Sequence, residues 1–319
     1  MCKLRQIFKN FLPGILLLVS VSMLAQEDKY SRAQQLYKTS PDIALLTIDS
    51  VIVHPQTQSD YNCWALRAFI YYELYKRTDR FKLYSPLRDS IISSLKVTFS
   101  LKPDSTTEIT GKKLIKTLSG GYYNLARTLL QDSINYERSL VAYNKFKELY
   151  VMFDPGVTFE AKDVEYYLAV GSTFSELFNK DNNNTNAGEI AKVTLLKVIE
   201  IQPDNPGANI NMGLMYYNQA VTLSKSLDYG ADFTQIDIVQ ENMIKLAKQA
   251  EGFIIKVYNN DNSNLKSIEA LYYIYRMLND IQKSDDFKKK GEEKGLKFTN
   301  EGGETKENKD NNDNQNKER

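Results

Sequence analysis

Apolar residues recur at intervals of three and four positions along almost every segment after residue 30, with polar residues between them. This spacing places the apolar side chains on one face of an α-helix, so it predicts amphipathic helices. Alternation typical of strands is scarce. The segment that shows it best, SVIVH at 50–54, also continues a helical face. The pattern therefore predicts an all-α protein.

The stretch 191–217 shows how one helix gives way to the next (AKVTLLKVIEIQPDNPGANINMGLMYY). Ala191, Leu195 and Val198 share one helical face. Pro203 is expected to end that helix, because proline lacks the N–H group that would continue the hydrogen-bond ladder.

A second helix is expected to begin directly after this break. Asn205 is a capping-type residue, and Pro206 fits the first turn of a helix. Within the new helix, Met212, Gly213 and Tyr216 share a face. Gly213 costs about 1 kcal/mol of helix propensity relative to alanine, which predicts that a neighbouring helix approaches closely at this point.

These spacings resemble the tetratricopeptide repeat, a pair of helices of roughly 34 residues with a proline near its end. One register fits both the helix that ends at Pro203 and the helix that follows. Weaker matches recur elsewhere in the chain, at 42–55, 63–74, 90–105, 121–130, 139–155, 165–174 and 267–278. The resemblance implies a right-handed superhelix, or α-solenoid, of antiparallel helix pairs, with about five irregular units in a domain at 26–299.

The units are expected to be irregular because double tyrosines recur at spacings of 51, 44, 50 and 56 residues. These spacings exceed the length of the repeat, so they predict insertions between the paired helices. The expected insertions are KRTDRFKLYSP at 76–86, NKDNNNTNAGE at 179–189 and LSKSLDYGADFTQIDIVQENM at 223–243.

Both ends of the chain differ from this domain. Residues 1–25 are typical of a secretory signal peptide: basic residues precede the apolar run FLPGILLLVSVSML, and Ala25 precedes a polar segment. The run is short for a bilayer-spanning helix, although a retained anchor is the alternative interpretation. Residues 300–319 contain few apolar side chains and are expected to form a disordered polar tail. We therefore expect an exported protein, periplasmic or secreted, with no membrane insertion after cleavage. The resemblance to irregular tetratricopeptide proteins implies a Gram-negative bacterium as its source.

The charge of the chain argues against nucleic acid as the main partner. The formal net charge is +1, and removal of the three basic residues in 1–25 gives −2 for the mature chain. No basic run is present, so neither nucleic-acid binding nor membrane association driven by overall charge is expected.

Catalytic and metal-binding patterns are poorly represented. His54 is the one histidine and lies beside a proline at an expected helix end, where a capping or surface role is typical. Cys63 is the one cysteine outside the signal segment, and its position beside Trp64 predicts packing between helices. Gly120 and Gly121 are expected to precede a helix but lack a phosphate-loop pattern.

The acidic pairs at 285–286 and 292–293 are typical of solvated helix faces, and the asparagine-rich segment at 179–189 lacks the spacing of a calcium loop. We therefore expect no cofactor, no metal and no enzymatic activity.

Surface recognition is the remaining class of function. In the tetratricopeptide family the first helix of each pair lines the concave face, and Tyr and Arg are common interface anchors. The resemblance predicts a partner-binding groove at Phe69, Tyr72, Tyr123, Arg127, Leu214, Tyr217, Tyr273 and Arg276. The favoured function is a scaffold that binds a protein or peptide of unknown identity. The alternative is a small molecule or glycan bound in a tyrosine-lined pocket, and an enzyme built on the insertions is the third hypothesis.

Overall fold

The structure is a computed structural model that describes residues 26–227, 230 and 232–298 of the 319-residue chain. This part of the chain is helical and contains no strand, which confirms the all-α prediction. Among the described helices, none combines the length and apolar character needed to cross a bilayer. The predicted signal peptide at 1–25 and the polar tail at 300–319 lie outside the described residues.

The chain divides into two compact units between Val157 and Thr158. The first unit begins with a helix at 26–36. Its later elements are α2 (Pro41–Ile52), α3 (Tyr61–Thr78), α4 (Pro86–Ser100), α5 (Ser105–Leu130), the short 3-10 helix η1 (Ser133–Asn135) and α6 (Tyr136–Phe153). The second unit contains α7 (Glu160–Lys180), α8 (Thr185–Ile201), α9 (Pro206–Lys225), α10 (Phe233–Asn260), α11 (Leu265–Met277) and α12 (Ile281–Glu293).

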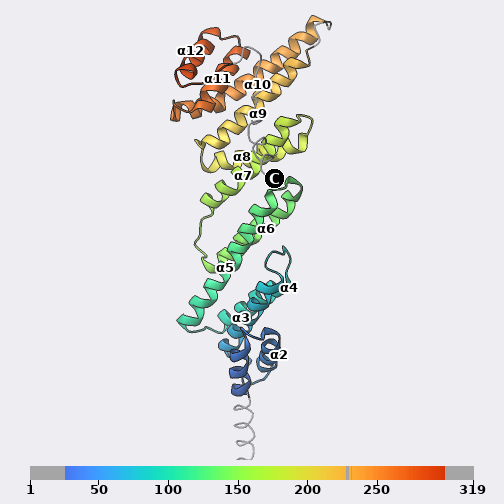
Figure 1. Cartoon of the computed structure of the whole chain (residues 1–319), viewed down its shortest axis with the longest axis vertical. Coiled ribbons are helices and arrows are strands. Elements are labelled where there is room, and N and C mark those ends of the chain that lie inside the picture. The colour runs from blue at the N-terminus through green and yellow to red at the C-terminus, as the bar shows by residue number, and fades with distance from the viewer. Residues whose placement is uncertain (1–25, 228–229, 231, 299–319) are drawn as a thin grey trace, which may run out of the picture. The chain divides into compact units, whose positions relative to one another are not determined.

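Helices that follow one another in sequence pack as antiparallel pairs (Figure 1). The pairs are α3 with α4, α5 with α6, α7 with α8, α9 with α10, and α11 with α12. Within the second unit, α9 also packs against α7 and α8, and α11 packs against α10. This arrangement confirms the predicted helix pairs, whereas the right-handed superhelix stays a prediction.

The boundary between α8 and α9 forms as the sequence predicts. Helix α8 ends at Ile201, and Asn205 caps α9 by accepting a hydrogen bond from the N–H of Ala208 at 3.0 Å. Pro206 occupies the first position of α9, where its missing N–H leaves no hydrogen bond unmade.

Gly213 of α9 lies where α10 approaches closely. A Cβ atom at this position would lie 2.5 Å from Cγ1 of Ile254 and 3.3 Å from the carbonyl oxygen of Ala250. The glycine therefore permits a contact that any side chain would obstruct, which confirms the predicted close approach.

The longest expected insertion is largely absorbed by helices, whereas the one at 76–86 supplies the connection between α3 and α4. Helix α5 has 26 residues and α10 has 28, and the segment predicted as an insertion at 223–243 lies mostly within α9 and α10. The prediction that Gly120 and Gly121 precede a helix is wrong, because both lie inside α5. The residues before them form a buried apolar face at Leu114, Ile115 and Leu118, and this burial carries the helix through the glycines.

Cys63 lies in an apolar cluster formed by the first described helix, α2 and α3, and Trp64 packs at its edge. The predicted packing role is confirmed. Burial, with a smaller effect of Asp60, raises the pKa of the Cys63 thiol to about 12, so the side chain is neutral at physiological pH.

Candidate functional site

The predicted groove residues lie on four helices, all of them first members of a pair. Helices α3 and α5 of the first unit carry Phe69, Tyr72, Tyr123 and Arg127, and helices α9 and α11 of the second unit carry Leu214, Tyr217, Tyr273 and Arg276.

The second unit brings its four predicted residues to one place. Tyr217 is buried in the apolar cluster formed by α9, α10, α11 and α12, and Leu214 and Tyr273 pack against the same cluster while partly exposed. Tyr217 also interacts electrostatically with Tyr273 and Arg276. Burial raises the pKa of Tyr217 to about 12, so its hydroxyl stays neutral.

Arg276 is exposed, and neighbouring side chains hold its guanidinium group in place. Nη1 donates a hydrogen bond to the hydroxyl oxygen of Tyr272 at 3.0 Å, and Cζ lies 5.7 Å from the centroid of the same ring. The Tyr272 ring in turn packs against Tyr273 at 4.7 Å and Phe298 at 4.4 Å between centroids. An oriented cation therefore lies beside partly exposed aromatic and aliphatic surface.

In the first unit, Phe69 and Tyr72 are partly exposed on α3. The Tyr72 ring stacks on Tyr75 with centroids 6.2 Å apart, and the Lys76 ammonium lies 4.9 Å from its centroid. These contacts orient Tyr72 without covering it.

On α5, Arg127 faces solvent, but Tyr123 is buried. The Tyr123 ring lies 5.0 Å from Phe146 and 6.1 Å from Tyr143 of α6, measured between centroids. Tyr123, like Tyr217, therefore offers little surface to a partner, and the other six predicted residues are the accessible candidates.

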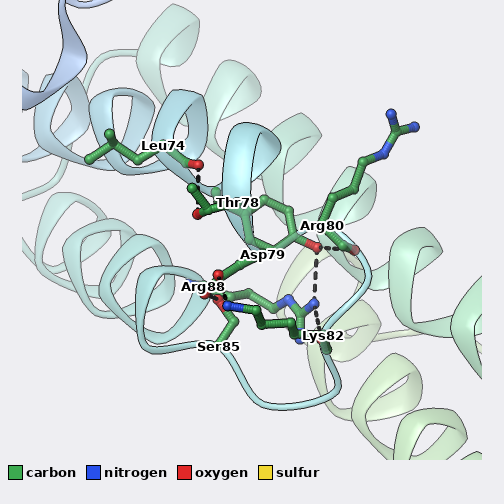
Figure 2. Close-up of polar contacts among 8 residues, drawn as sticks. Leu74, Thr78, Asp79, Arg80, Lys82, Ser85 and Arg88 are labelled. Atoms are coloured by element: carbon green, nitrogen blue, oxygen red, sulfur yellow. Dashed lines mark hydrogen bonds and ion pairs between the residues drawn. The ribbon is translucent and has the colours of Figure 1, made fainter.

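The sequence did not indicate the role of Arg88, a buried arginine in the first turn of α4. Figure 2 shows its guanidinium group inside the curve of the connection between α3 and α4. Nη2 donates to the hydroxyl of Tyr75 at 2.9 Å and to the carbonyl of Lys82 at 2.8 Å, and Nη1 donates to the carbonyl of Leu83 at 3.2 Å. The guanidinium group also stacks on Tyr122 of α5, 3.9 Å from the ring centroid.

Asp79 and Ser85 hold the two ends of the same connection (Figure 2). The Asp79 carboxylate accepts hydrogen bonds from Lys82 Nζ at 2.6 Å and from Ser85 Oγ at 2.8 Å. Ser85 Oγ also accepts from the N–H of Arg88 at 3.1 Å, which caps α4. The hydrogen bonds from Lys82 and Ser85 hold the pKa of Asp79 below its ordinary value. Residues 79–85 are therefore a fixed connection.

The serine–proline pair at 85–86 predicts the start of a helix. Arginine is usually exposed, so the local sequence does not predict that Arg88 is buried.

Two of the surface recesses in the described part of the chain lie between helices of one unit. One, of ≈ 230 Å³, lies between α4, α5 and α6 and is lined by Asp89, Ile92, Ser93, Lys96, Tyr122, Lys145, Glu148, Leu149 and Met152. The other, of ≈ 250 Å³, lies between α7, α8 and α9 and is lined by Phe178, Asn182, Thr185, Gly188, Glu189, Lys192, Met212, Met215, Tyr216 and Gln219. Each has one tyrosine in its lining, so neither matches the tyrosine-lined pocket of the alternative hypothesis.

Metal-binding and acid–base groups are dispersed. Across residues 26–227 and 232–298, no three His, Cys, Asp or Glu side chains are grouped to hold a metal ion. His54 follows α2, and its Nδ1 accepts a hydrogen bond from the N–H of Gln56 at 3.3 Å.

Comparison with known proteins finds a likeness to solved structures, but no family model matches the chain and no curated protein matches its sequence. Among solved structures, it is similar to PilW, a widely conserved type IV pilus biogenesis factor, with 13% identity and a TM-score of 0.26 over 83% of this chain and 91% of that chain. At that identity and TM-score the likeness gives no information about partner or function. The helix pairs and the residue pattern are what resemble the tetratricopeptide repeat.

Proposed function

We propose that this chain is an exported, non-enzymatic helical-repeat scaffold that binds a protein or peptide through the first helices of its pairs. The observation that supports this function is the convergence of Leu214, Tyr273 and Arg276 from α9 and α11. They meet around the buried Tyr217 ring. Tyrosine and arginine are among the residues that most often dominate the energy of protein interfaces.

The geometry favours binding without rearrangement. Arg276 is already oriented by Tyr272, and Tyr273 and Leu214 are fixed by packing. Side chains ordered during folding lose little entropy on association, so more of the contact energy appears as affinity. A guanidinium group beside apolar rings fits a peptide segment in which a carboxylate or carbonyl lies next to an apolar side chain.

The recess between α7, α8 and α9 supports the alternative of a small ligand. Asn182 lines it, and its Oδ1 is buried without a hydrogen-bond partner among the described residues. A ligand with a hydrogen-bond donor would satisfy that oxygen. Phe178, Met212 and Met215 supply apolar surface, but the single tyrosine gives little support to stacking on sugars.

Site-specific photocrosslinking tests the scaffold function. A photoreactive residue at Leu214 or Tyr273 should yield the same discrete protein adduct in cells. Matched probes at the exposed positions Lys192 of α8 and Lys245 of α10 should not. Equal adducts from all four positions would contradict a defined binding face.

The crosslinked partner then allows a direct measurement. With both proteins purified, Arg276→Ala should weaken the complex about tenfold or more, the effect expected of an interface anchor. Lys245→Ala is the matched control and should leave the affinity unchanged. Export, which is part of the proposal, is tested by the amino-terminal sequence of the mature protein from the periplasmic fraction.

A further inference from the structure

Two large aromatic side chains project from the connection between α3 and α4. Phe81 is 80% exposed and Tyr84 is 72% exposed, while Leu83 between them is buried. An aromatic side chain that is fully buried removes roughly 150–250 Å² from water, so leaving two rings exposed on one short connection forgoes substantial stabilisation. Exposed apolar surface that is rimmed by polar residues is a candidate interaction site.

The connection holds these rings outward because its backbone is fixed from below. The carbonyl of Arg80 accepts a hydrogen bond from the Tyr75 hydroxyl at 3.1 Å, and the carbonyls of Lys82 and Leu83 accept from buried Arg88 (Figure 2). Three successive anchoring points leave the connection little freedom to turn the rings inward. Their exposure is therefore a property of the fold.

Basic residues lie on the connection and in the last turn of α3 before it. Glu73 pairs with Lys76 at 2.8 Å and Asp79 pairs with Lys82 at 2.6 Å, whereas no carboxylate among the described residues pairs with Arg77 or Arg80. The guanidinium carbon of Arg80 lies 5.5 Å from the centroid of the Phe81 ring.

The positive region extends to the segment before α2. Arg77 Nη2 donates to the carbonyl of Lys38 at 2.8 Å, which places Lys38 at the same end of the unit as the connection. Ile43, in the first turn of α2, adds exposed apolar surface next to this segment. The charge is local, because the whole chain is nearly neutral.

We propose that this surface, formed by Phe81, Tyr84 and the cations at 38, 77 and 80, docks on the headgroup region of a membrane that contains anionic phospholipid. Aromatic rings favour the boundary between headgroups and acyl chains, and lysine and arginine next to them pair with lipid phosphates. Rings that project from a convex connection fit a deformable lipid surface, whereas a protein partner would need a preformed pocket to receive them. Two rings and a few cations give reversible, peripheral binding without insertion of a helix.

Vesicle co-sedimentation tests the proposal. The probe is purified chain 26–319, which excludes the apolar amino-terminal segment, with vesicles of phosphatidylcholine alone or mixed equally with phosphatidylglycerol. The chain should sediment with the mixed vesicles, and raised salt should weaken binding because it screens the cations. Binding to neither vesicle, or equal binding to both, would overturn the proposal.

Matched variants locate the binding surface. Phe81→Ala with Tyr84→Ala should reduce partitioning about tenfold or more, and Arg77→Gln with Arg80→Gln should reduce it about fivefold for each charge removed. Phe233→Ala of α10 removes an aromatic ring that is 85% exposed and should leave partitioning unchanged. An equal loss in the Phe233 variant, or none in the Phe81 and Tyr84 variant, would contradict the assignment.

The same variants distinguish a lipid surface from a protein. If the Phe81 and Tyr84 double variant binds mixed vesicles like the parent chain but fails to capture the partner crosslinked at Leu214, the connection is a protein contact and the lipid proposal is wrong. Unchanged fluorescence of Trp64 in each variant confirms that the first unit remains folded, because that side chain lies on α3 of the same unit.

Discussion

Replacing Arg88 with methionine tests whether a buried cation can stabilise a helix pair without a carboxylate in contact with it. Methionine keeps most of the aliphatic stem and removes the guanidinium group. The substitution deletes the hydrogen bonds to Tyr75, Lys82 and Leu83 and the stacking on Tyr122. The connection between α3 and α4 would then lose its central support.

The expected magnitude follows from these contacts. Each of the three acceptors left without its donor costs about 1 kcal/mol, and the desolvated contact with the Tyr122 ring adds about 2 kcal/mol. The variant no longer has a desolvated charge in its core, and the absence of this desolvation cost offsets about 2 kcal/mol of the lost stability. We therefore expect Arg88→Met to lower the free energy of unfolding of the first unit by about 3 kcal/mol.

Trp64 reports on this unit alone, because it is the one tryptophan of the chain and lies on α3. Urea unfolding followed by Trp64 emission should show a lower midpoint for Arg88→Met. Thermal unfolding should show a melting temperature lower by on the order of 10 °C. Arg138→Met, which removes an exposed arginine from α6 of the same unit, is the control and should change stability by less than about 0.5 kcal/mol. An unchanged or raised midpoint in Arg88→Met would refute the reasoning, since desolvation of the cation would then outweigh its contacts.

Three further outcomes are expected. Gly213→Ala should destabilise the second unit by about 2 kcal/mol in urea unfolding followed by circular dichroism. At Gly252 of α10 an added Cβ meets no atom within 4 Å, so Gly252→Ala should stabilise the unit by about 0.5–1 kcal/mol. The pKa of Cys63 is raised from 9.0 to about 12, so the thiol holds its proton more tightly in the folded first unit than in the unfolded chain. The free energy of unfolding, followed by tryptophan emission, should therefore fall as the pH rises from about 9 to 12. The fall should be smaller in Cys63→Ala. Tyr275→Phe, which removes the hydrogen bond to Glu251 at 2.8 Å, should cost about 1 kcal/mol by circular dichroism, and no change would show that water replaces it.

Local chemistry made part of the fold predictable from sequence. The cap at Asn205 and proline at 206 depend on backbone groups within a few residues, so their pattern identifies the start of α9. Gly213 was informative for a similar reason: a residue that weakens a helix needs a compensating contact, and α10 supplies it. The exact stacking of the pairs depends on side chains from distant segments and has no comparable local signal.

Tertiary burial overrode local propensity in α5. Gly120 and Gly121 each lower helix propensity by about 1 kcal/mol, which favours a helix start after them. The apolar face at Leu114, Ile115 and Leu118 continues to Tyr122, and burial of that face along α6 outweighs the cost. The residues immediately around the two glycines do not reveal this burial, so the local sequence alone does not predict that the helix continues.

At the candidate site, too, the sequence did not reveal which side chains are buried. The repeat pattern identified the helices that carry the groove residues, and α9 and α11 do bring Leu214, Tyr217, Tyr273 and Arg276 together. It did not identify which tyrosines turn inward. Consecutive helical residues differ by about 100° around the axis, and a wide apolar face takes in both members of a tyrosine pair.

Arg88 contributes both to the stability of the first unit and to the presentation of its exposed rings. Arg88 closes the base of the connection, while Phe81 and Tyr84 project from its outer side. Loss of Arg88 should therefore lower both the stability of the unit and its binding to anionic vesicles, whereas loss of the two rings should lower binding alone. The two variants differ because the buried cation fixes the backbone that carries the rings, whereas the solvated rings make no contribution to the packing of the core.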